Sequence, residues 1–309
     1  MLFAANGGAK PTVKNGREAL DAEDSTMLLT MLKIFLILDL VCLVLAGLFM
    51  LSMRTKRRPK TGFYIRLADR YYAHRGLHAI HAGIPENSLR AFRLAANNGF
   101  GAELDVRMSR DGRLVVMHDE SLKRTTGANA NISGVTAQVL GQLTLEGTRE
   151  KVPYLEDVLP IFEGKTPLLI ELKTENGNHE ELTDQVTSLL TRYPGLDFMI
   201  ESFDPRVLLW LKKNRPDIIR GQLAENYFKD PEVVCNPVMK FILSNLMANF
   251  LTRPDFVAYR YEDRDDLAPG LCKKLWKPQM FWWVVRSQAD ANSLREQSDL
   301  CIFEGFAAK

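Results

Sequence analysis

Two histidines and three carboxylates stand at or near the ends of predicted strands in this sequence. They are His74, Glu103, Asp105, His118 and Glu171. Side chains alternate along a strand with period two, so Glu103 and Asp105 share one face. Three converging carboxylates repel one another unless a cation neutralises them, and oxygen-only ligands favour Mg²⁺ or Ca²⁺. The two histidines could supply one acid and one base near neutral pH.

A β-hairpin is predicted to bring His118 beside Asp105. Asp111-Gly112 lies between two alternating runs, which is a strong signal for a two-residue type I′ turn. Pairing outward from this loop sets Asp105 opposite His118, and directly opposed Cβ atoms lie about 5 Å apart. We therefore expect the carboxylates and His118 to converge at the base of the hairpin.

Two cations accompany these groups in the sequence. Arg75 follows His74, and Lys173 lies two residues after Glu171. Fixed positive charge suits a phosphate group. A metal ion, two cations and a histidine pair would together make a site that cleaves phosphodiesters. The alternative is that the carboxylates only form salt bridges with Arg75 and Lys173.

Strands and helices alternate from residue 70 onward, with helical stretches such as Ser88–Asn98 and Glu181–Arg192 between most strands. This order predicts an α/β protein built as a (β/α)8 TIM barrel, in which active sites form at the C-terminal rim. A doubly wound open sheet is the alternative, but no Gly-rich phosphate loop follows the first strand. The eight predicted strands are Tyr71–His74, Ala102–Val106, Leu168–Lys173, Phe198–Ser202, Ile218–Leu223, Phe256–Tyr261, Phe281–Arg286 and Leu300–Glu304.

A set of motifs in this order and spacing resembles the glycerophosphodiester phosphodiesterase family, a phospholipase-C-like phosphodiesterase barrel. The resemblance covers residues 72 to about 304. Together with the N-terminal anchor described below, it indicates a membrane-anchored, bacterial-type member of this family. The matching stretches are His74-Arg75-Gly76, Pro85-Glu86-Asn87-Ser88-Leu89, Glu103-Leu104-Asp105-Val106, Asp111-Gly112, Val116-Met117-His118-Asp119, Arg124-Thr125-Thr126-Gly127, Val152-Pro153-Tyr154-Leu155-Glu156, Glu171-Leu172-Lys173, Ser202-Phe203 and Trp283-Val284-Val285-Arg286.

The resemblance implies a barrel over residues 69–309, with the hairpin and a small insertion at about 119–160 on its C-terminal rim. It also implies roles for the residues singled out above. These are Glu103, Asp105 and Glu171 as ligands of one divalent cation, His74 and His118 as the acid/base pair, and Arg75 and Lys173 as phosphate-binding groups. Asn87 and Trp283 could contact substrate. Mild departures occur at Ser88, Ser109, Val284 and Cys301–Phe306, and none removes a catalytic group.

The activity that the resemblance implies is metal-dependent hydrolysis of glycerophosphodiesters to sn-glycerol 3-phosphate and an alcohol. The route would pass through a cyclic phosphate, because an intramolecular hydroxyl has a high effective molarity. Such an enzyme would serve phospholipid or glycerol metabolism. Two alternatives stay open: lysophospholipase D-type cleavage of lysophospholipids, and a catalytically silent, membrane-tethered binding protein on the same fold.

The N-terminal region is expected to be a membrane anchor. Of the 20 residues from Ile34 to Met53, 17 are apolar and only Asp39 is charged, which suits a helix spanning the ~30 Å bilayer core. The basic run Arg54–Lys60 holds five cations, so the positive-inside rule places the barrel in the cytoplasm. We expect a disordered tail over residues 1–30, a transmembrane helix over 31–53 and a linker over 54–68. A buried core helix and a cleaved signal peptide are the alternatives.

Composition excludes some other classes of partner. The 309 residues carry a net charge of +2, split into +4 over residues 1–60 and −2 over the remainder, so there is no basic field for nucleic acid. Four cysteines in a chain of this length do not form a disulfide framework.

The apolar stretch from Val233 to Phe250 predicts an amphipathic helix that covers the barrel, with an interfacial membrane helix as the alternative.

Overall fold

The computed structural model describes residues 14–56, 67, 70–231, 233–306 and 308, without the side chains of 14–25. The chain divides into two units, Met1–Phe49 and Met50–Lys309. Of the expected tail, residues 1–13 lie outside the described residues. So do residues 57–66, 68 and 69, which include most of the expected linker and the expected first residue of the barrel.

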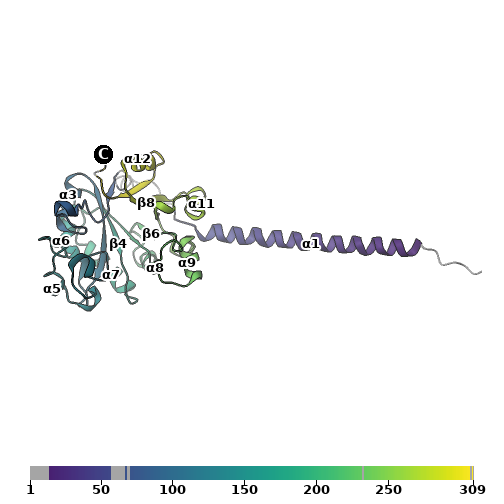
Figure 1. Ribbon diagram of the computed structural model, residues 1–309, viewed down its shortest axis with the longest axis horizontal. Helices are drawn as coiled ribbons and strands as arrows, with labels where there is room; N and C mark the ends of the chain where they lie inside the picture. Colours follow the sequence, from purple (N-terminus) through teal and green to yellow (C-terminus); the bar gives the residue numbers. More distant parts are fainter. Residues whose placement is uncertain (1–13, 57–66, 68–69, 232, 307, 309) are drawn as a thin grey trace, which may run out of the picture. The chain divides into compact units, whose positions relative to one another are not determined.

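Helix α1 begins at Lys14 and ends at Ser52, so all but its last three residues belong to the first unit (Figure 1). Its segment Thr26–Ser52 contains an 18-residue stretch with a mean hydropathy of 2.9, and by length and composition it could be a membrane span or a signal sequence. The structure differs from the disordered tail expected for residues 1–30, because the chain is already helical from Lys14. The stretch Arg17–Ala22 contains Arg, Glu, Ala and Leu, which favour helix.

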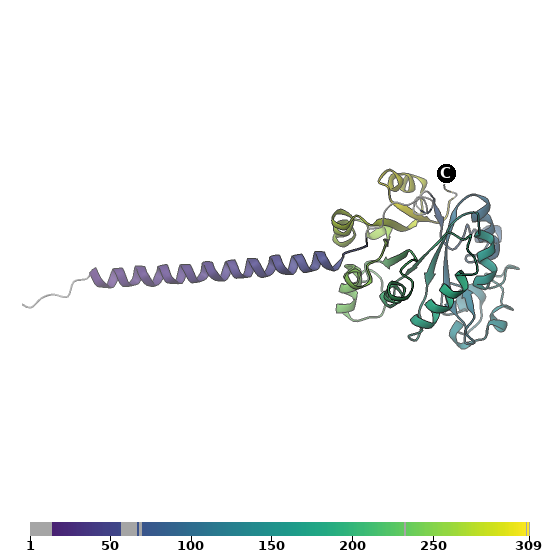
Figure 2. The ribbon, with the colours of Figure 1, turned by 180° about the vertical axis from the view of Figure 1, so that it is seen from behind.

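The second unit is a closed barrel of eight parallel strands, as the sequence predicts (Figures 1 and 2). Strand β1 closes the ring, because it pairs in parallel with both β2 and β9. The short antiparallel strand β3 (Leu114–Val116) extends from β2. The barrel strands are β1 (Tyr72–Ala73), β2 (Gly101–Met108), β4 (Leu168–Leu172), β5 (Phe198–Ser202), β6 (Arg220–Ala224), β7 (Phe256–Arg260), β8 (Gln279–Val285) and β9 (Leu300–Phe303).

Helices between the strands cover the outside of the barrel. Ser88 begins α3, because its side chain accepts a hydrogen bond from the Ala91 backbone N–H. Asp204 caps α8 in the same way, with Pro205 at the first helical position. The helices are α3 (Leu89–Asn97), α6 (Leu155–Phe162), α7 (His179–Leu190), α8 (Pro205–Asn214), α9 (Pro237–Ser244), α10 (Asn249–Thr252), α11 (Leu267–Trp276) and α12 (Gln288–Glu296), with 3₁₀ turns η1 (Ile80–Ala82) and η3 (Tyr261–Asp263).

Apolar side chains fill the interior of the barrel near the N-terminal ends of its strands. Phe256 and Phe281 pack with their ring centroids 4.9 Å apart, and Tyr72 packs on Phe281 at 5.5 Å. Gly221 makes room for this layer, since a Cβ there would lie 2.0 Å from the Phe256 ring. Leu169 is fully buried in the same cluster. The charged residues of β2 and β4 therefore lie farther along their strands, toward the C-terminal rim.

The hairpin after β2 has a register one residue away from the predicted one. Arg107 pairs with Val115, and the Ser109 N–H donates to the Arg113 carbonyl. The loop thus has three residues and ends at Gly112, which is left-handed with φ 77°. A three-residue loop with a left-handed glycine is the common alternative to the type I′ turn. The prediction that Asp105 directly faces His118 was wrong, because the Asp105 carbonyl accepts a hydrogen bond from Met117 instead.

A small subdomain lies between β3 and α6. It contains α4 (Lys123–Thr126), η2 (Ile132–Gly134) and α5 (Ala137–Leu140), and its buried residues form a second hydrophobic cluster with Val115 and Met117. Helix α6 packs instead on α3, with the rings of Phe92 and Phe162 6.1 Å apart. The α6 part of the expected insertion at about 119–160 therefore belongs to the helical layer of the barrel.

Candidate active site

One cavity of about 510 Å³ at the C-terminal rim gathers most of the residues that the sequence singled out. His74, Glu103, His118 and Glu171 all line it. Parallel pairing sets Asp105 beside Glu171, and Glu171 beside Glu201 on the next strand. His118 lies past the end of β3, where regular pairing has stopped, and so it reaches the cavity despite the shifted register.

The three carboxylates of Glu103, Asp105 and Glu171 form a buried cluster. One oxygen of each lies within 4.8 Å of the others, which could hold a metal ion. Burial raises the pKa of Glu103 well above its usual range, and the charges of Asp105 and Glu171 raise it further. Burial likewise raises the pKa of Glu171. The described protein groups alone thus do not offset the charge of three ionised carboxylates, whereas a divalent cation would.

Lys173 lies directly against this cluster. Its Nζ is 2.8 Å from Glu171 Oε1 and 3.1 Å from Asp105 Oδ1. Burial opposes its charge, but the two carboxylates raise the pKa of Lys173. Burial would also raise the pKa of Asp105, yet Lys173, His118 and Arg75 hold it well below its usual range. Asp105 is therefore an ionised carboxylate surrounded by cations.

Arg75 and Asn87 support the carboxylates from the loops after β1. The Arg75 backbone N–H donates to Glu103 at 3.0 Å, and its Nε is 3.5 Å from Asp105. Asn87 Nδ2 donates to Asp105 Oδ2 at 2.8 Å. The buried Arg75 Nε and Asn87 Oδ1 find no hydrogen-bond partner among the described residues. Both side chains therefore keep a polar atom available to a ligand.

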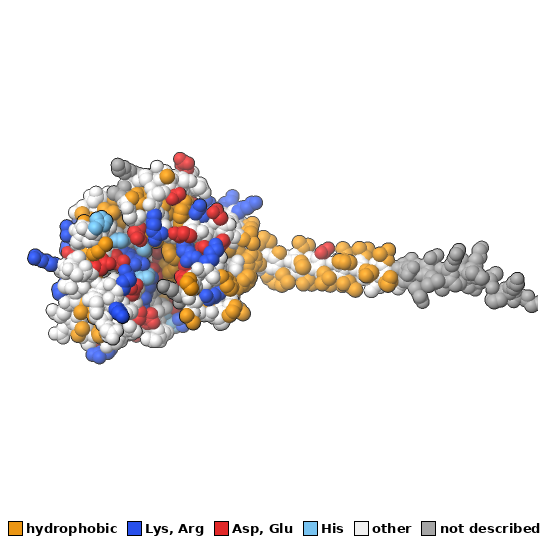
Figure 3. Space-filling view, in the orientation of Figure 1, with side chains coloured by type: hydrophobic (Ala, Val, Ile, Leu, Met, Phe, Trp, Pro, Cys, Tyr) orange, Lys and Arg blue, Asp and Glu red, His pale blue; other side chains and the backbone are white. Residues whose placement is uncertain are grey.

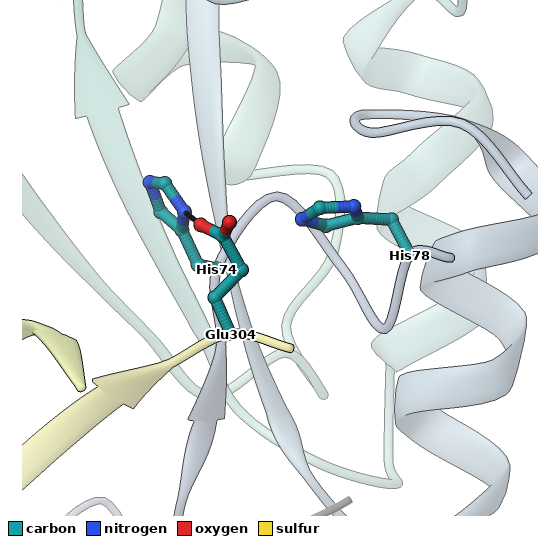
Figure 4. Close-up of side chains that lie close together, drawn as sticks. All are labelled: His74, His78 and Glu304. Carbon is teal, nitrogen blue, oxygen red and sulfur yellow. Dashed lines mark hydrogen bonds and ion pairs between the residues drawn. The ribbon is translucent and has the colours of Figure 1, made fainter. Parts of the chain in front are cut away.

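His74 is oriented by a residue at the opposite end of the barrel sequence. Its Nδ1 lies 2.6 Å from Glu304 Oε2 (Figure 4). Its Nε2 is 4.0 Å from Glu103 Oε2. Burial lowers the pKa of His74 to about 4, although the Glu304 hydrogen bond opposes this shift. That same hydrogen bond lowers the pKa of Glu304 to about 2. His78 also lies close to Glu304 in Figure 4.

His118 has a carboxylate partner of its own. Its Nδ1 lies 2.7 Å from Asp119 Oδ1, and the hydrogen bond lowers the pKa of Asp119. Arg124 then joins Asp119 to Glu86, whose other partner is Arg75 at 2.9 Å. A chain of alternating charges thus connects the Arg75 guanidinium with the second histidine.

Aromatic side chains form one wall of the cavity. Trp283 lines it and packs edge-to-face on Phe203 at 5.6 Å between ring centroids. Its buried Nε1 finds no hydrogen-bond partner among the described residues. Lys173 Nζ lies 5.8 Å from the centre of the Phe203 ring. The wall therefore offers an apolar surface beside the charged groups, with one indole donor.

Sequence reasoning missed several charged residues of this cavity. Glu201 is buried beside the carboxylate cluster, and burial raises its pKa well above the usual range. Its position in register with Glu171 at the end of the next strand was the available signal. Glu304 was assigned only to a strand end, and Glu86 only to a motif. Glu225 also lines the cavity, and burial raises its pKa to about 7.

The sequence pattern of the Glycerophosphoryl diester phosphodiesterase family matches residues 74–258, which include every part of the histidine and carboxylate arrangement except Glu304. The chain belongs to this family. It is therefore a phosphoric diester hydrolase by family, and the family supports a glycerophosphodiester as its substrate.

Two relatives illustrate the range of this family. The protein YhdW of Bacillus subtilis (strain 168), provisionally described as a glycerophosphodiester phosphodiesterase, is 28% identical over 233 residues, covering 72% of this chain and 88% of YhdW. Lysophospholipase D GDPD1 of Homo sapiens is 36% identical over 121 residues. That match covers 35% of this chain and 37% of the human protein, little more than a third of each.

Solved structures share the barrel of this phosphodiesterase. A glycerophosphodiester phosphodiesterase from Thermotoga maritima is 27% identical, with a TM-score of 0.57 over 76% of this chain and 94% of that one. A phosphodiesterase from Oleispira antarctica, in complex with the product sn-glycerol-3-phosphate, is 23% identical. Its TM-score is 0.62 over 78% of this chain and 94% of that one, which establishes a common fold.

Proposed function

We propose that this enzyme hydrolyses glycerophosphodiesters to sn-glycerol 3-phosphate and an alcohol, by acid/base catalysis from His74 and His118. The observation that carries the proposal is the matched pairing of the two histidines. Each has Nδ1 within 2.7 Å of a carboxylate oxygen, from Glu304 and Asp119. A carboxylate at Nδ1 favours the tautomer with its proton there, which leaves Nε2 to accept or donate a proton.

We propose that Glu103, Asp105 and Glu171 hold one divalent cation, Mg²⁺ or Ca²⁺. The donor set fits, because all three supply oxygen ligands and their atoms lie within 4.8 Å of one another. A bound cation would polarise the phosphoryl oxygens and offset charge that develops on them. Asn87 would keep Asp105 in place through its 2.8 Å hydrogen bond.

The remaining residues act on the phosphodiester directly in this proposal. Arg75 and Lys173 bind its non-bridging oxygens, and Trp283 bounds the space for the organic part of the substrate. One histidine takes the proton of the neighbouring glycerol hydroxyl, which attacks phosphorus, while the other donates a proton to the leaving alcohol. A cyclic phosphate results, and the histidines exchange roles as water opens it. The product would feed phospholipid or glycerol metabolism.

We further propose that residues 31–53, with Ile34–Met53 as the apolar core, anchor the enzyme in the cell membrane. Residues 1–30, which are helical from Lys14, would precede the anchor, and residues 54–68 would be the linker. The barrel, residues 69–309 with the insertion at about 119–160, would lie in the cytoplasm. Five cations in Arg54–Lys60 and an 18-residue stretch of mean hydropathy 2.9 within Thr26–Ser52 support this topology. An anchored barrel would meet lipid substrates, and the human relative is named a lysophospholipase D. Lysophospholipid cleavage is therefore our second candidate activity.

An assay of glycerol phosphate release tests the first proposal. The full chain is incubated with a water-soluble glycerophosphodiester in the presence of Mg²⁺ or Ca²⁺, and separately with a chelator. We expect release with a divalent cation and none with the chelator. No release from any soluble or lipid diester would instead support a catalytically silent binding protein.

A further inference from the structure

Helices α9 and α10 present apolar side chains to solvent on one side of the barrel. Of its eight residues, α9 buries only Ser244. Figure 3 shows hydrophobic side chains gathered over the edge of the barrel that carries α9. Exposed apolar surface of this kind marks an interaction site. We define the α9 face by four exposed residues: Val234 at 97%, Val238 at 68%, Phe250 at 53% and Leu251 at 55%.

Two cations lie within the stretch that carries the α9 face, although Asp230 and Glu232 stand directly before it. The sequence from Val233 to Pro254 contains Lys240 and Arg253 but no Asp or Glu. The Arg253 guanidinium lies 5.7 Å from the centre of the Phe250 ring. Lys212 Nζ reaches the α10 backbone, where it donates to the Leu251 carbonyl at 2.6 Å. Apolar side chains bordered by cations suit a surface of anionic lipid headgroups.

The end of the apolar helix and the residue that follows it are held by α11 and by α10. The Trp276 indole N–H of α11 donates to the Met50 carbonyl at 2.9 Å. Asn249, the first residue of α10, lies 3.5 Å from the Met53 carbonyl, and the Met53 side chain is fully buried. Consecutive Cα atoms are about 3.8 Å apart. If Thr26–Ser52 crosses a bilayer, α10 must therefore lie close to the bilayer surface.

A groove connects the α9 face with the active site. Its volume is about 960 Å³, within the range of ligand-binding sites. It shares Glu171, Lys173 and Phe203 with the active-site cavity. The wall on the α9 side is apolar: it is formed by Tyr227, Val233, Val234, Cys235, Met239 and Leu243. An alkyl chain that entered beside Val234 could thus extend to the Lys173 ammonium.

We propose that the α9 face rests on the bilayer, and that the groove takes up the acyl chain of a lysophospholipid drawn from that bilayer. This inference rests on the proposed phosphodiesterase activity and names the source of its substrate. The groove removes the single acyl chain from water, while the phosphodiester lies beside Lys173. A diacyl lipid has no free glycerol hydroxyl next to its phosphate, so the cyclic route requires the single-chain lipid.

Activity in proteoliposomes tests the α9 face. The full chain is compared with Val238→Glu and Leu251→Glu, and with Val139→Glu as a control on α5, where the side chain is 49% exposed. The substrates are 1-acyl glycerophosphocholine in the vesicles and glycerophosphocholine in solution. We expect the two face variants to lower kcat/KM for the acyl substrate about tenfold, since each replaces an apolar contact with a charge. Activity on the soluble substrate stays unchanged, and Val139→Glu changes neither.

A second measurement does not depend on catalysis. Val238→Cys and Val139→Cys are each made in a chain with Cys42→Ser and Cys235→Ser, because Cys272 and Cys301 are buried. A fluorescent maleimide at each position is exposed to vesicles that carry a nitroxide at the lipid headgroup. We expect strong quenching at position 238 and little at 139.

The outcomes separate the two proposals. Equal quenching at both positions, or full activity of both face variants on the acyl substrate, overturns the membrane-facing role of α9. Quenching at position 238 with no hydrolysis of either substrate by the wild type supports the docking surface and overturns the proposed function. Hydrolysis of the soluble substrate alone by the wild type overturns the acyl-chain groove.

Discussion

His74 Nδ1 lies 2.6 Å from a carboxylate oxygen of Glu304, although 230 residues separate the two in sequence. The contact joins the first and last strands of the barrel, which pair in parallel through Ala73 and Phe303. Barrel closure thus supplies the acidic partner of the first histidine. The second histidine finds its partner in the next residue, Asp119.

The first prediction concerns this contact. Glu304→Gln should lower kcat roughly 10- to 100-fold, because the neutral amide can present its NH₂ group and favour the wrong tautomer of His74. Circular dichroism and the melting temperature should stay close to wild type. Glu296→Gln, an exposed position at the end of α12, is the matched control. Unchanged kcat in Glu304→Gln would show that Glu304 does not position His74.

The histidines themselves carry the second prediction. His74→Ala and His118→Ala should each reduce kcat by about 10²- to 10⁴-fold, the usual contribution of a general acid or base. The fold should persist, because His118 is one-third exposed at the rim. His179→Ala, at a partly exposed position at the start of α7 and outside the cavity, provides the control. Wild-type activity in either variant would remove that histidine from the mechanism.

The sequence predicted the barrel and its central residues for a physical reason. Glu103, Asp105 and Glu171 lie on strands, and parallel strands bring their C-terminal ends to one rim whatever the details of the loops. The contact between His74 and Glu304 could not be predicted in the same way. Nothing local in the sequence reports which side chain of the last strand meets the first strand once the barrel closes.

The hairpin shows a second limit of the sequence. Asp111-Gly112 suits both a two-residue type I′ turn and a three-residue loop that ends in a left-handed glycine. In the structure Ser109 Oγ donates to Asp111 Oδ1 at 2.7 Å, and the three-residue loop forms. The register moves by one residue, so Met117 rather than His118 lies opposite Asp105. The location predicted for His118 was confirmed, whereas the pairing that led to it was wrong.

The third prediction concerns the metal ion. In the wild type, Mg²⁺ or Ca²⁺ should raise the melting temperature, because a ligand that binds only the folded state stabilises it. Glu103→Gln should lose this increase together with activity. Without metal, however, this variant should melt higher than the wild type, because it removes a buried carboxylate whose pKa is raised by burial and by its acidic neighbours.

Differential scanning fluorimetry with chelator and with added cation measures both effects. Glu180→Gln on α7 is the control, since the side chain is exposed. An equal cation-dependent increase in Glu103→Gln and wild type would exclude Glu103 as a ligand.

The fourth prediction concerns membrane topology. Five cations follow the apolar helix within Arg54–Lys60, and if that helix spans the membrane, the positive-inside rule predicts that the barrel lies in the cytoplasm. A protease added to sealed inside-out vesicles should digest the barrel, whereas right-side-out vesicles should protect it. Detergent lysis of the right-side-out vesicles controls for intrinsic resistance. Digestion in intact right-side-out vesicles would reverse the proposed orientation.

The last prediction links pH to stability through Asp263, away from the carboxylate cluster. Its buried carboxylate accepts hydrogen bonds from Arg260 at 2.7 Å, from the Asn226 backbone at 2.9 Å and from Lys229 at 3.0 Å. Burial alone would raise the pKa of Asp263, but these donors lower it below its ordinary value of 3.8. In the unfolded chain the group protonates at a higher pH than in the folded protein. Its stabilising contribution is therefore fully present above the unfolded pKa and is lost as pH falls through the folded pKa.

Asp263→Asn should accordingly lower the free energy of unfolding at neutral pH by about 1–3 kcal/mol, the cost of leaving buried hydrogen-bond partners unpaired. The difference from wild type should shrink as the pH falls below 4, because the wild-type carboxylate then loses its charge as well. Asp265→Asn is the control, since that side chain is 89% exposed. Urea unfolding at pH 7 and pH 3 measures both values. A difference that stays constant between the two pH values would mean that the shape of the side chain at position 263, rather than its charge, provides the stability.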